Sequence, residues 1–478
     1  MYNSIPHAIK ANADKIPDKT VIIDKFGEIS YKDYFSLIEK TAVFFKNYGI
    51  NFGDKVVLVA RQDRKFLSVF HALQIIGAIP LPMERSTKNE RVEELYNLTF
   101  AKVCISSSDI PNVNSLKYED IVFDNYTDTI KITLNDVAEI LFTTGTTGKS
   151  KGVVMSHIAD VAVAENVCFG VEMKRENVEI IPMPLNHAFA LRRYYSNIIN
   201  GSTVVLLDGV INMKLLFDSV EKYGVTAMAM NPAALGILLK MASKQLSAIA
   251  YKIDYLQFGS AHLPDEDKLK IKKLLPNARL YDLYGSTESG CTCISEFSSN
   301  ELENCIGKPT AHADFKIIDE NNNPLPPNEK GRLICGGEMN MTEYYNSPEL
   351  TAETLVDGYV YSNDLCTMDE EGRIYYFGRC DDVITTGGNK ISPQEVEDMA
   401  ITYKGIDDCA LIGVPDAILG SAPKLFVVPN NLYNEDELIK HISQKAEYYM
   451  IPKSVEIIDK IPKTFNGKPK RKELRKEK

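Results

Sequence analysis

The first clear pattern of apolar and polar positions lies between Ser30 and Gly49. Apolar side chains recur there at steps of three and four residues, the spacing of one face of an α-helix. They are Tyr34, Phe35, Ile38, Ala42, Phe45 and Tyr48. A serine before such a stretch and a glycine after it are typical of the two ends of a helix. The pattern therefore predicts an amphipathic helix between these two residues.

Apolar runs and helical patterns alternate along much of the chain. An apolar run at 55–60 is followed by a helical pattern at 65–76, a turn at Gly77 and another apolar run. The alternation returns at 203–207, 212–223, 225–230, 232–243, 254–258, 265–275 and 279–283. Strands that alternate with helices indicate parallel sheets with helices on both faces. We therefore expect an α/β protein.

The pattern changes after Gly285. Polar, turn-rich segments such as 321–327 and 369–372 separate short β-like runs, which favours an antiparallel or barrel-like portion. A last βα pattern occupies 395–403, 409–414, 424–428, 435–448 and 454–458. This pattern is short enough to form a small domain of its own. We expect one domain at 1–380 and a second at 381–478.

Composition and charge narrow the class of protein. The 478 residues are 44% apolar and 25% charged, which is ordinary for a globular chain and excludes disorder and collagen. The net charge of −11 opposes binding to nucleic acid or to anionic membranes. No apolar run approaches the ~20 residues needed to cross a bilayer, and the amino end lacks a signal-peptide pattern. Together with nine scattered cysteines, these features favour a soluble, cytoplasmic protein.

Two local features invite other interpretations. Nine basic residues lie in the segment from Lys460 to Lys478. Such a segment is more often a solvated C-terminal stretch than a nucleic-acid-binding tail. Cys291 and Cys293 form the one close pair of cysteines in the sequence. Because no second pair or histidine cluster lies beside them, we expect two buried thiols rather than a metal site.

The candidate chemistry begins in a loop at 143–152. An apolar run at 137–142 leads into the sequence TTGTTGKSKG, which combines hydroxyls, glycines and two lysines. Glycines let backbone N–H groups converge on an oxyanion, and hydroxyls and lysines add donors and positive charge. A polar turn between strands is the alternative. We interpret the segment as a phosphate-binding loop.

This loop differs from a Walker A loop in two ways. The Walker motif needs a glycine five residues before Gly148, where this chain has Thr143. It also opens a helix, whereas residues 152–155 are glycine-led and β-branched and predict a strand. A P-loop kinase is therefore rejected.

The loop resembles the Thr-Ser-Gly-Thr-Thr-Gly-x-Pro-Lys-Gly signature of acyl-adenylate-forming enzymes, with Thr144 in place of serine and Ser150 in place of proline. Four further segments resemble motifs of this superfamily in the same order: 284–288 (YGSTE), 361–364 (YSND), 378–381 (GRCD) and 462–468 (PKTFNGK). The superfamily includes acyl- and aryl-CoA ligases, peptide-synthetase adenylation domains and beetle luciferase. The resemblance implies the adenylate-forming fold, with a large N-terminal domain of stacked α/β sheets and a barrel-like part, and a small mobile C-terminal α+β domain.

The resemblance also implies a two-step reaction. A carboxylate attacks the α-phosphorus of ATP to give acyl-AMP and pyrophosphate, and a thiol then displaces AMP. Donors and cations must offset the phosphate charge during the first step. Thr287 would contact the α-phosphate, and the carboxylate of Glu288 would hold Mg²⁺, a hard cation that prefers oxygen ligands. The implied residues for the other phosphates are Thr143, Thr144, Gly145, Thr146, Thr147, Gly148 and Lys151.

An adenosine site follows from the same resemblance. Tyr284 would stack on the base, and Asp282 would meet its exocyclic amine. Asp364 would bind the ribose hydroxyls, with Arg379 nearby. Ser260 stands where the superfamily has a glycine, so we expect a slightly narrower pocket. The implied site also includes Gly259, Ser260, Ala261, Gly285 and Tyr376.

The small domain is implied to carry the catalytic lysine. Lys468 would bridge the carboxylate oxygen and the α-phosphate during adenylation. The domain would then rotate about Asp381 and bring the loop with Gly387 and Gly388 to the site for attack by a thiol. The pantetheine arm of CoA, or of an acyl carrier protein, would pass beside these glycines.

The identity of the carboxylic acid is less well defined. His187 resembles the gate of many acyl- and aryl-CoA ligases, and a core histidine is the alternative. Ala188 stands where peptide synthetases usually place an aspartate for the α-ammonium of an amino acid, and an unpaired buried ammonium is costly. Arg192 and Arg193 are either ligands for a second acidic or phenolic group or surface residues of a helix.

The expected function is that of an enzyme that uses ATP and Mg²⁺ to couple a small carboxylic acid to CoA. One alternative is a stand-alone adenylation enzyme that loads the phosphopantetheine of a carrier protein, and another is an oxygen-using luciferase. A non-catalytic nucleotide-binding protein would require lost catalytic residues, and every expected one is present.

Overall fold

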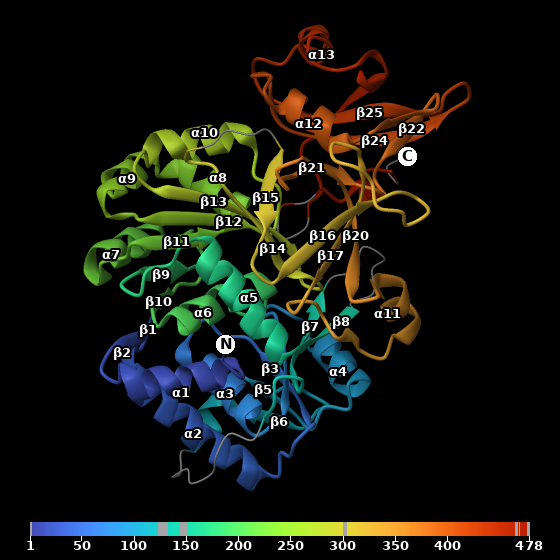
Figure 1. The fold of residues 1–478 in the computed structure, drawn as a ribbon. Coiled ribbons are helices and arrows are strands. Elements are labelled where there is room, and N and C mark those ends of the chain that lie inside the picture. Colours follow the sequence, from blue (N-terminus) through green and yellow to red (C-terminus); the bar gives the residue numbers. More distant parts are fainter. Residues whose placement is uncertain are drawn as a thin grey trace.

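The amino-terminal region forms a small parallel sheet with connecting helices (Figure 1). The computed structural model describes residues 2–122, 132–143, 151–299, 304–463, 467 and 469–475. The strand order is β4 (Ile79–Met83), β3 (Lys55–Val59), β5 (Val103–Ser106) and β6 (Ser115–Lys117), and neighbouring strands are parallel. Helices α3 (Arg64–Ile75) and α4 (Asn89–Leu98) connect them, and η1 (Tyr118–Asp120) follows β6. The alternation predicted for this region is confirmed.

The helix predicted between Ser30 and Gly49 is α2 (Tyr31–Tyr48), which packs beside α1 (Ile5–Lys15). The Ser30 hydroxyl accepts a hydrogen bond from the backbone N–H of Asp33, and Gly49 ends the helix in the left-handed conformation, at φ 91°. Tyr34 and Phe45 are fully buried. The helix is therefore held by the two end residues and the apolar face that the sequence predicted.

A second sheet of 14 strands runs through the rest of the large domain. Its parallel part contains β1 (Thr20–Asp24), β10 (Thr203–Leu206), β9 (Val178–Ile181), β11 (Ala227–Met230), β12 (Tyr255–Gly259) and β13 (Arg279–Ser286), and β2 (Gly27–Ser30) pairs antiparallel with β1. The accompanying helices are α5 (His157–Gly170), α6 (Ala188–Asn200), α7 (Met213–Tyr223), α8 (Pro232–Met241), α9 (Ser243–Ala248), η2 (Ala250–Lys252) and α10 (Asp265–Leu274), and the α-helices among them are labelled in Figure 1. Within the described ranges, none of the helices is long and apolar enough to cross a membrane.

The same sheet continues as antiparallel strands after β13. The order is β14 (Gly290–Glu296), β15 (Cys305–Pro309), β21 (Ile374–Arg379), β20 (Tyr359–Met368), β17 (Gly331–Gly337) and β16 (Ala313–Ile318). The short elements α11 (Pro348–Thr354) and β19 (Leu355–Val356) precede β20. Cys291 and Cys293 are buried on β14, as expected for structural thiols. The change to antiparallel pairing after Gly285 is confirmed.

A three-stranded sheet of order β18 (Glu343–Tyr344), β8 (Lys151–Ser156) and β7 (Val137–Thr143) frames the predicted phosphate loop. Strands β7 and β8 pair antiparallel, with Thr143 opposite Lys151. The loop is therefore followed by a strand and not by a helix. This geometry confirms the rejection of a Walker A loop.

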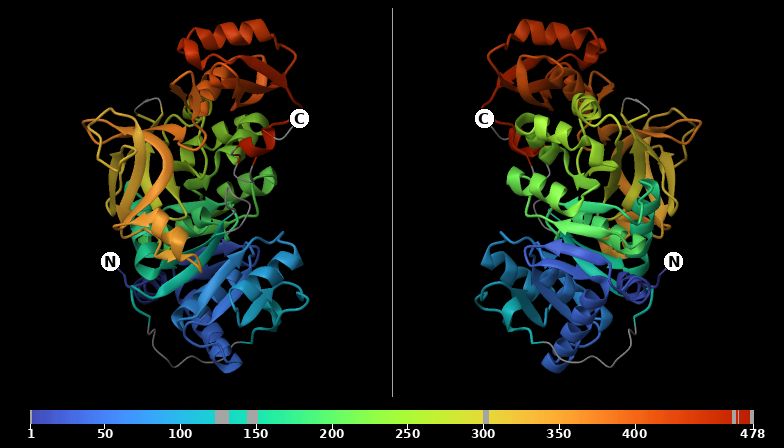
Figure 2. Two further views of the ribbon diagram at one scale, coloured as in Figure 1. Left: turned by 90° about the vertical axis from the view of Figure 1, so that its right-hand side faces the viewer. Right: turned by 90° about the vertical axis from the view of Figure 1, so that its left-hand side faces the viewer.

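The small C-terminal domain has its own hydrophobic core and lies at one end of the molecule, at the top of Figures 1 and 2. Val396, Leu411, Leu425 and Leu438 contribute to this core. The sheet contains β24 (Ile406–Asp416), β25 (Gly420–Pro429) and β26 (Ser454–Ile457). The other elements are β22 (Ile384–Thr386), β23 (Asn389–Ile391), α12 (Pro393–Ile401), α13 (Glu435–Ser443), η3 (Tyr448–Met450) and α14 (Arg471–Leu474). The boundary between residues 380 and 381 stays a prediction.

Candidate active site

The predicted site residues gather at the carboxyl ends of two adjacent strands. Residues 259–261 lie at the end of β12, and residues 284–288 lie at the end of β13 and in its turn to β14. Gly259 pairs with Leu283 across these strands. In open α/β sheets, ligands bind outside the carboxyl ends of parallel strands. The position in the sheet therefore agrees with a binding site.

Tyr344 joins the phosphate loop to the predicted magnesium ligand. The Lys151 ammonium lies 5.3 Å from the centre of the Tyr344 ring, and the Tyr344 hydroxyl donates to Glu288 Oε1 at 2.7 Å. Thr144, Gly145, Thr146, Thr147 and Gly148 lie outside the described residues. Tyr344 belongs to a two-residue strand paired with β8, and no motif in the sequence identified it.

Glu288 offers a partly exposed carboxylate beside the end of this loop. Mg²⁺ prefers oxygen ligands and commonly uses one or two protein carboxylates together with substrate phosphates. Among the residues with described positions, no three His, Cys, Asp or Glu side chains form a group that could hold a metal ion. Glu288 therefore fits a magnesium ion shared with bound phosphates better than an ion held by protein ligands alone.

The predicted adenosine residues form a second group. The Tyr284 hydroxyl donates to the Asp364 carboxylate, and the Tyr284 and Tyr376 rings lie with their centres 6.3 Å apart. Asp364 on β20 pairs with Arg379 on β21, and 3.8 Å separates Arg379 Nη1 from Asp364 Oδ1. Aromatic surface and a carboxylate are the groups that an adenine ring and a ribose diol require.

Asp282 lies two residues before Tyr284 on β13 and is buried. The Lys268 ammonium is 3.5 Å from Asp282 Oδ2. Burial raises the pKa of Asp282, while the charges of Lys268 and His262 act in the opposite direction. Lys268 and His262 are neighbours that the sequence did not identify.

Ser260 adopts a backbone conformation that favours glycine, with φ of +77°. A non-glycine residue in the left-handed region carries a steric cost between Cβ and the backbone. At Gly259 an added Cβ would lie 3.1 Å from Phe189 Cε2 and 3.2 Å from the Leu283 carbonyl oxygen. The glycine at 259 is therefore required by the limited space around its Cα, whereas the backbone conformation at 260 favours glycine although the chain has serine there. The narrower pocket expected from Ser260 stays a prediction.

Gly387 and Gly388 form the two-residue turn of a β-hairpin between β22 and β23. Their φ values are +53° and +86°, so both residues need the positive φ that glycine adopts readily. The Gly387 N–H donates to the carbonyl of Leu419 at 3.0 Å. Asp381 is half-exposed and accepts a hydrogen bond from Arg379 Nε at 3.1 Å. The roles of these residues in thiol attack and domain rotation stay predictions.

Lys468 lies outside the described residues, and Gly467 before it is described. A Cβ added at Gly467 would lie 3.9 Å from Ala233 Cβ on α8 of the large domain. Farther along, Arg471 forms two hydrogen bonds with the buried Glu397 carboxylate, at 2.6 and 2.7 Å. The basic C-terminal stretch is therefore partly anchored by ion pairs within the small domain, and plain solvation does not account for all of it.

The two adjacent arginines of α6 are both buried, so the expectation of surface residues is wrong. Arg193 forms a buried ion pair with Glu179 and contacts the Tyr255 hydroxyl. Arg192 donates to the backbone carbonyls of residues 286 and 287. Neither guanidinium is therefore directed to a second acidic group of a substrate in this structure.

His187 lies immediately before α6 and is partly buried. Burial lowers the pKa of its imidazole, whereas the charge of Glu84 raises it. The net effect favours the neutral form of His187. A neutral imidazole at this position is compatible with a gate as well as with a core histidine.

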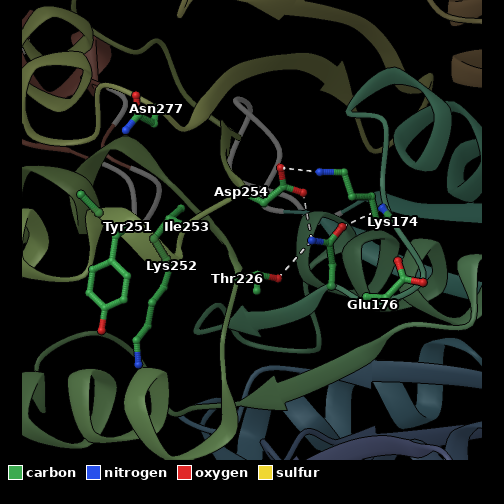
Figure 3. Close-up of a pocket in the computed structure, with 10 residues that line it drawn as sticks. Lys174, Glu176, Thr226, Tyr251, Lys252, Ile253, Asp254 and Asn277 are labelled. Atoms are coloured by element: carbon green, nitrogen blue, oxygen red, sulfur yellow. Dashed lines mark hydrogen bonds and ion pairs between the residues drawn. The ribbon is translucent and has the colours of Figure 1, made fainter.

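A pocket of about 490 Å³ lies at the amino ends of the parallel strands, whereas the candidate site lies at their carboxyl ends. Figure 3 shows the residues that line this pocket. Thr226, Asp254 and Asn277 line it, close to the amino ends of β11, β12 and β13. Three of the charged groups in its wall have partners, since Lys174 pairs with Asp254 and Lys252 pairs with Glu221. No predicted site residue lines this pocket.

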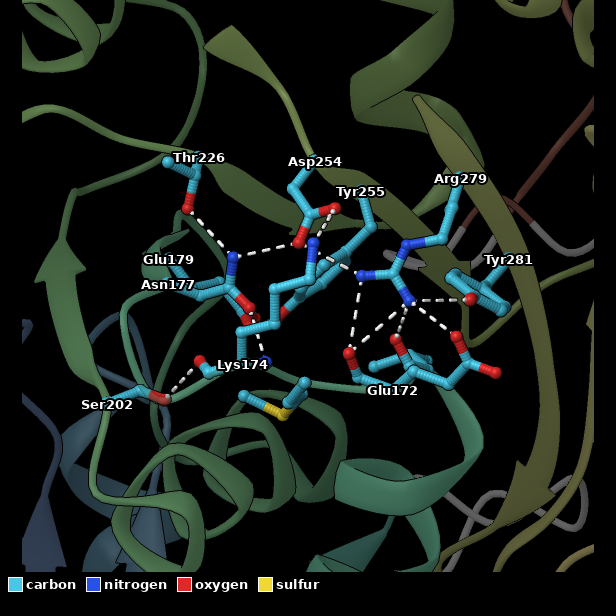
Figure 4. Close-up of polar contacts among 12 residues, drawn as sticks. Glu172, Lys174, Asn177, Glu179, Ser202, Thr226, Asp254, Tyr255, Arg279 and Tyr281 are labelled. Carbon is cyan, nitrogen blue, oxygen red and sulfur yellow. Dashed lines mark hydrogen bonds and ion pairs between the residues drawn. The ribbon is translucent and has the colours of Figure 1, made fainter. Parts of the chain in front are cut away.

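The polar contacts beside this pocket tie strand ends together (Figure 4). Asp254 accepts from Asn177, Lys174 and Arg279, at 3.0 to 3.1 Å. Burial raises the pKa of Asp254, but these three donors outweigh it and hold the pKa below its ordinary value. The network therefore has a structural function at the edge away from the candidate site.

Comparisons with known protein families agree with this geometry. The model of the AMP-binding enzyme family matches residues 9–345, and the model of the AMP-binding enzyme C-terminal domain matches residues 395–468. The chain therefore belongs to the AMP-binding enzyme family.

Relatives and solved structures cover nearly the whole chain. A 2-succinylbenzoate–CoA ligase of Bacillus anthracis (strain A0248) is 24% identical over 491 residues, covering 99% of each chain. The same enzyme of Bacillus cytotoxicus is 26% identical and covers 99% of this chain and 98% of its own. ATP-bound MatB from Rhodopseudomonas palustris has a TM-score of 0.91 at 21% identity, with 99% and 98% coverage. The anthranilate CoA ligase AuaEII, in complex with anthranoyl-AMP, has a TM-score of 0.89 at 20% identity, with 99% and 97% coverage.

Proposed function

We propose that this protein activates a carboxylic acid with ATP, releases pyrophosphate, and transfers the acyl group from acyl-AMP to the thiol of CoA. The observation that carries the proposal is the contact of Tyr344 with both Lys151 and Glu288. One side chain thus contacts both a lysine of the phosphate loop and a carboxylate suited to magnesium, which supports a shared phosphate and magnesium site. The relatives named as 2-succinylbenzoate–CoA ligases and the solved anthranilate CoA ligase support the proposal.

In the first half-reaction, the chain holds ATP at two places. Thr143 and Lys151 bind the outer phosphates, and Thr287 contacts the α-phosphate. Asp364 accepts hydrogen bonds from the ribose hydroxyls, and the ring of Tyr284 lies against the base. Glu288 would hold Mg²⁺, which would supply positive charge against the phosphates. Lys468 donates to the carboxylate oxygen and the α-phosphate.

In the second half-reaction, the small domain rotates about Asp381 and the turn at Gly387 and Gly388 meets the pantetheine arm. We place the domain boundary between residues 380 and 381. The acceptor is CoA, as in the names of the relatives. The substrate is an aryl or short acyl acid, because Ala188 offers no charge partner for an α-ammonium group.

The test is exchange of labelled pyrophosphate into ATP over a panel of carboxylic acids. At least one aryl or acyl acid should support exchange that depends on Mg²⁺, and CoA should then yield a thioester. If no acid supports exchange, the adenylation proposal is wrong. If exchange occurs but the acyl group passes to a carrier protein and not to CoA, the acceptor is wrong and the adenylation step stands.

A further inference from the structure

The side chain of Arg192 reaches from α6 to the turn that carries Thr287 and Glu288. Its Nη1 donates to the carbonyl oxygen of Ser286 at 2.6 Å, and its Nη2 donates to that of Thr287 at 2.7 Å. Arg192 is only 7% exposed. A single guanidinium therefore holds two consecutive peptide groups, a geometry that suits the planar fork of arginine and not the single ammonium of lysine.

The next peptide group of this turn is held by a different segment. The backbone N–H of Met341 donates to the carbonyl oxygen of Glu288 at 2.7 Å, and the Tyr344 hydroxyl donates to the Glu288 carboxylate. Three consecutive carbonyls and one carboxylate of the turn are thus fixed. Arg192 supplies the contacts to two of those carbonyls.

The guanidinium of Arg192 also interacts with two buried carboxyl groups, those of Asp160 and Glu139, whose own pKa values are raised by burial. Burial lowers the pKa of the guanidinium, while the charges of Asp160 and Glu139 raise it. Each carboxyl residue is 1% exposed, and Glu139 accepts a hydrogen bond from Tyr195 of α6. Glu139 belongs to β7, which leads into the phosphate loop. The arrangement therefore links the strand before the loop to the turn after β13.

The neighbouring Arg193 provides a contrast. Its guanidinium pairs with Glu179 and donates to the Tyr255 hydroxyl, and among the described residues it forms no hydrogen bond with the turn. Arg193 therefore stabilises the core of the parallel sheet, whereas Arg192 touches the candidate site. The two residues are adjacent in sequence but serve different parts of the structure.

We infer that Arg192 is a positioning residue for adenylation, which fixes the peptide groups of residues 286–287 so that Thr287 and Glu288 meet the α-phosphate and Mg²⁺. This inference rests on the proposed function. In this role Arg192 contacts neither ATP nor the acid and acts through the backbone of the turn. Removing it should change the affinity for magnesium and the rate of adenylation, and not the affinity for the carboxylic acid.

The test compares Arg192→Met and Arg192→Lys with wild type. For Arg192→Met we expect kcat of pyrophosphate exchange to fall by about 10- to 100-fold, the effect of losing charge-assisted hydrogen bonds. The Mg²⁺ concentration for half-maximal exchange should rise, with the KM for the acid unchanged. Arg192→Lys keeps the charge and should recover only part of the loss. Calorimetric titration of ATP with and without Mg²⁺ provides a readout that needs no turnover.

Ser196→Ala is the matched control on the same helix. The Ser196 hydroxyl is buried and donates to the backbone carbonyl of Arg192, so its removal perturbs α6 without touching the turn. The control should lower the melting temperature and leave the Mg²⁺ dependence unchanged. If folded Arg192 variants match this control, the inference is wrong.

Two other outcomes are also decisive. A raised KM for the acid with unchanged Mg²⁺ dependence would make Arg192 a substrate ligand and would overturn the positioning role. If wild type shows no exchange with any acid, the proposed function fails. The magnesium-dependent binding of ATP then still decides the inference, because unchanged binding in both Arg192 variants would contradict it.

Discussion

His262 and Asp398 form an ion pair between the large and the small domain, with 3.2 Å between His262 Nε2 and Asp398 Oδ1. His262 follows the strand end at residues 259–261, and Asp398 lies on α12. Gln394 of the same helix also donates to Asp398, at 2.9 Å. The contact therefore connects the end of β12 to the small domain in the orientation that the structure shows.

The first prediction is a pH dependence of this contact. Burial lowers the pKa of His262, but the hydrogen bond and charge of Asp398 outweigh it and the net shift is upward; Lys268 lowers the pKa and Asp282 raises it. A raised pKa means that the stabilisation is complete below the ordinary pKa of histidine and is lost as pH rises through the raised value. Asp398→Asn should therefore cost up to about 1 kcal/mol near pH ~6 and nothing near pH ~9.

Thermal unfolding of wild type and Asp398→Asn across this pH range measures the effect. His262→Gln is the matched variant and should show the same pH dependence of the loss. An equal loss for Asp398→Asn at both ends of the range would show that the carboxylate stabilises the small domain without charge on His262.

The second prediction concerns Ser260, whose φ is +77°. Glycine adopts this conformation without the Cβ cost, so Ser260→Gly should stabilise the protein by up to about 1 kcal/mol. Ser260→Val should destabilise it by about 1–2 kcal/mol, because a β-branched side chain tolerates positive φ poorly. Chemical denaturation of the three proteins should give the order Gly, Ser, Val. The reverse order would show that side-chain contacts outweigh backbone strain here.

The sequence predicted those helices and strands whose signals lie in residues close together along the chain. The ends and buried face of α2 follow from Ser30, Gly49 and a three- and four-residue repeat, which are all local signals. The strand after the phosphate loop was predicted from the β-branched residues at 152–155. Local steric and hydrophobic preferences carry the signal for such features, so the sequence alone predicts them.

Long-range contacts could not be predicted in the same way. Tyr344 meets Lys151 and Glu288 only because a two-residue strand pairs with β8. Arg192 lies 94 residues before the carbonyl of Ser286 that it binds. The helical pattern of α6 predicts which side chains share a face but not which turn that face meets. The motifs identified the candidate site, whereas the residues that hold it in place required the structure.

The third prediction separates backbone conformation from space at Gly388. No atom of the described residues lies within 4 Å of a Cβ built there, and its φ is +86°. Gly388→Leu should therefore disturb the turn through its conformation and lower thioester formation by about 10-fold or more, while pyrophosphate exchange survives. Gly388→Asn should stay close to wild type, because asparagine tolerates positive φ. An equal fall in both half-reactions would remove the turn from the thiol side of the cycle.

The fourth prediction tests Lys468. Lys468→Ala should lower acyl-AMP formation by about 10²-fold or more, the effect of removing one positioned donor to a developing charge. Thioester formation from synthetic acyl-AMP should be spared, because the lysine is needed where the carboxylate meets the phosphate. Lys463, which pairs with Asp408 at 2.6 Å, gives the control: Lys463→Ala removes a nearby lysine from the same basic stretch. A similar loss in both variants would point to the fold of the small domain instead of to Lys468.

The final prediction concerns the choice of acid. Ala188 and Phe189 begin α6, and the Phe189 ring lies close to Gly259 at the end of β12. An α-amino acid bound at this end of the helix would bring an ammonium that Ala188 cannot pair, and leaving such a group without a partner can lower kcat/KM by several orders of magnitude. One methylene in an apolar pocket changes discrimination by only about 1–3 kcal/mol. Rejection of the amino group should therefore be sharper than selection for chain length.

Pyrophosphate exchange with acids matched in size, with and without an α-amino group, measures this discrimination. Ala188→Asp should reduce the discrimination by restoring a counter-charge. A wild type that prefers the amino acids would overturn the CoA-ligase proposal in favour of a peptide-synthetase-like adenylation enzyme.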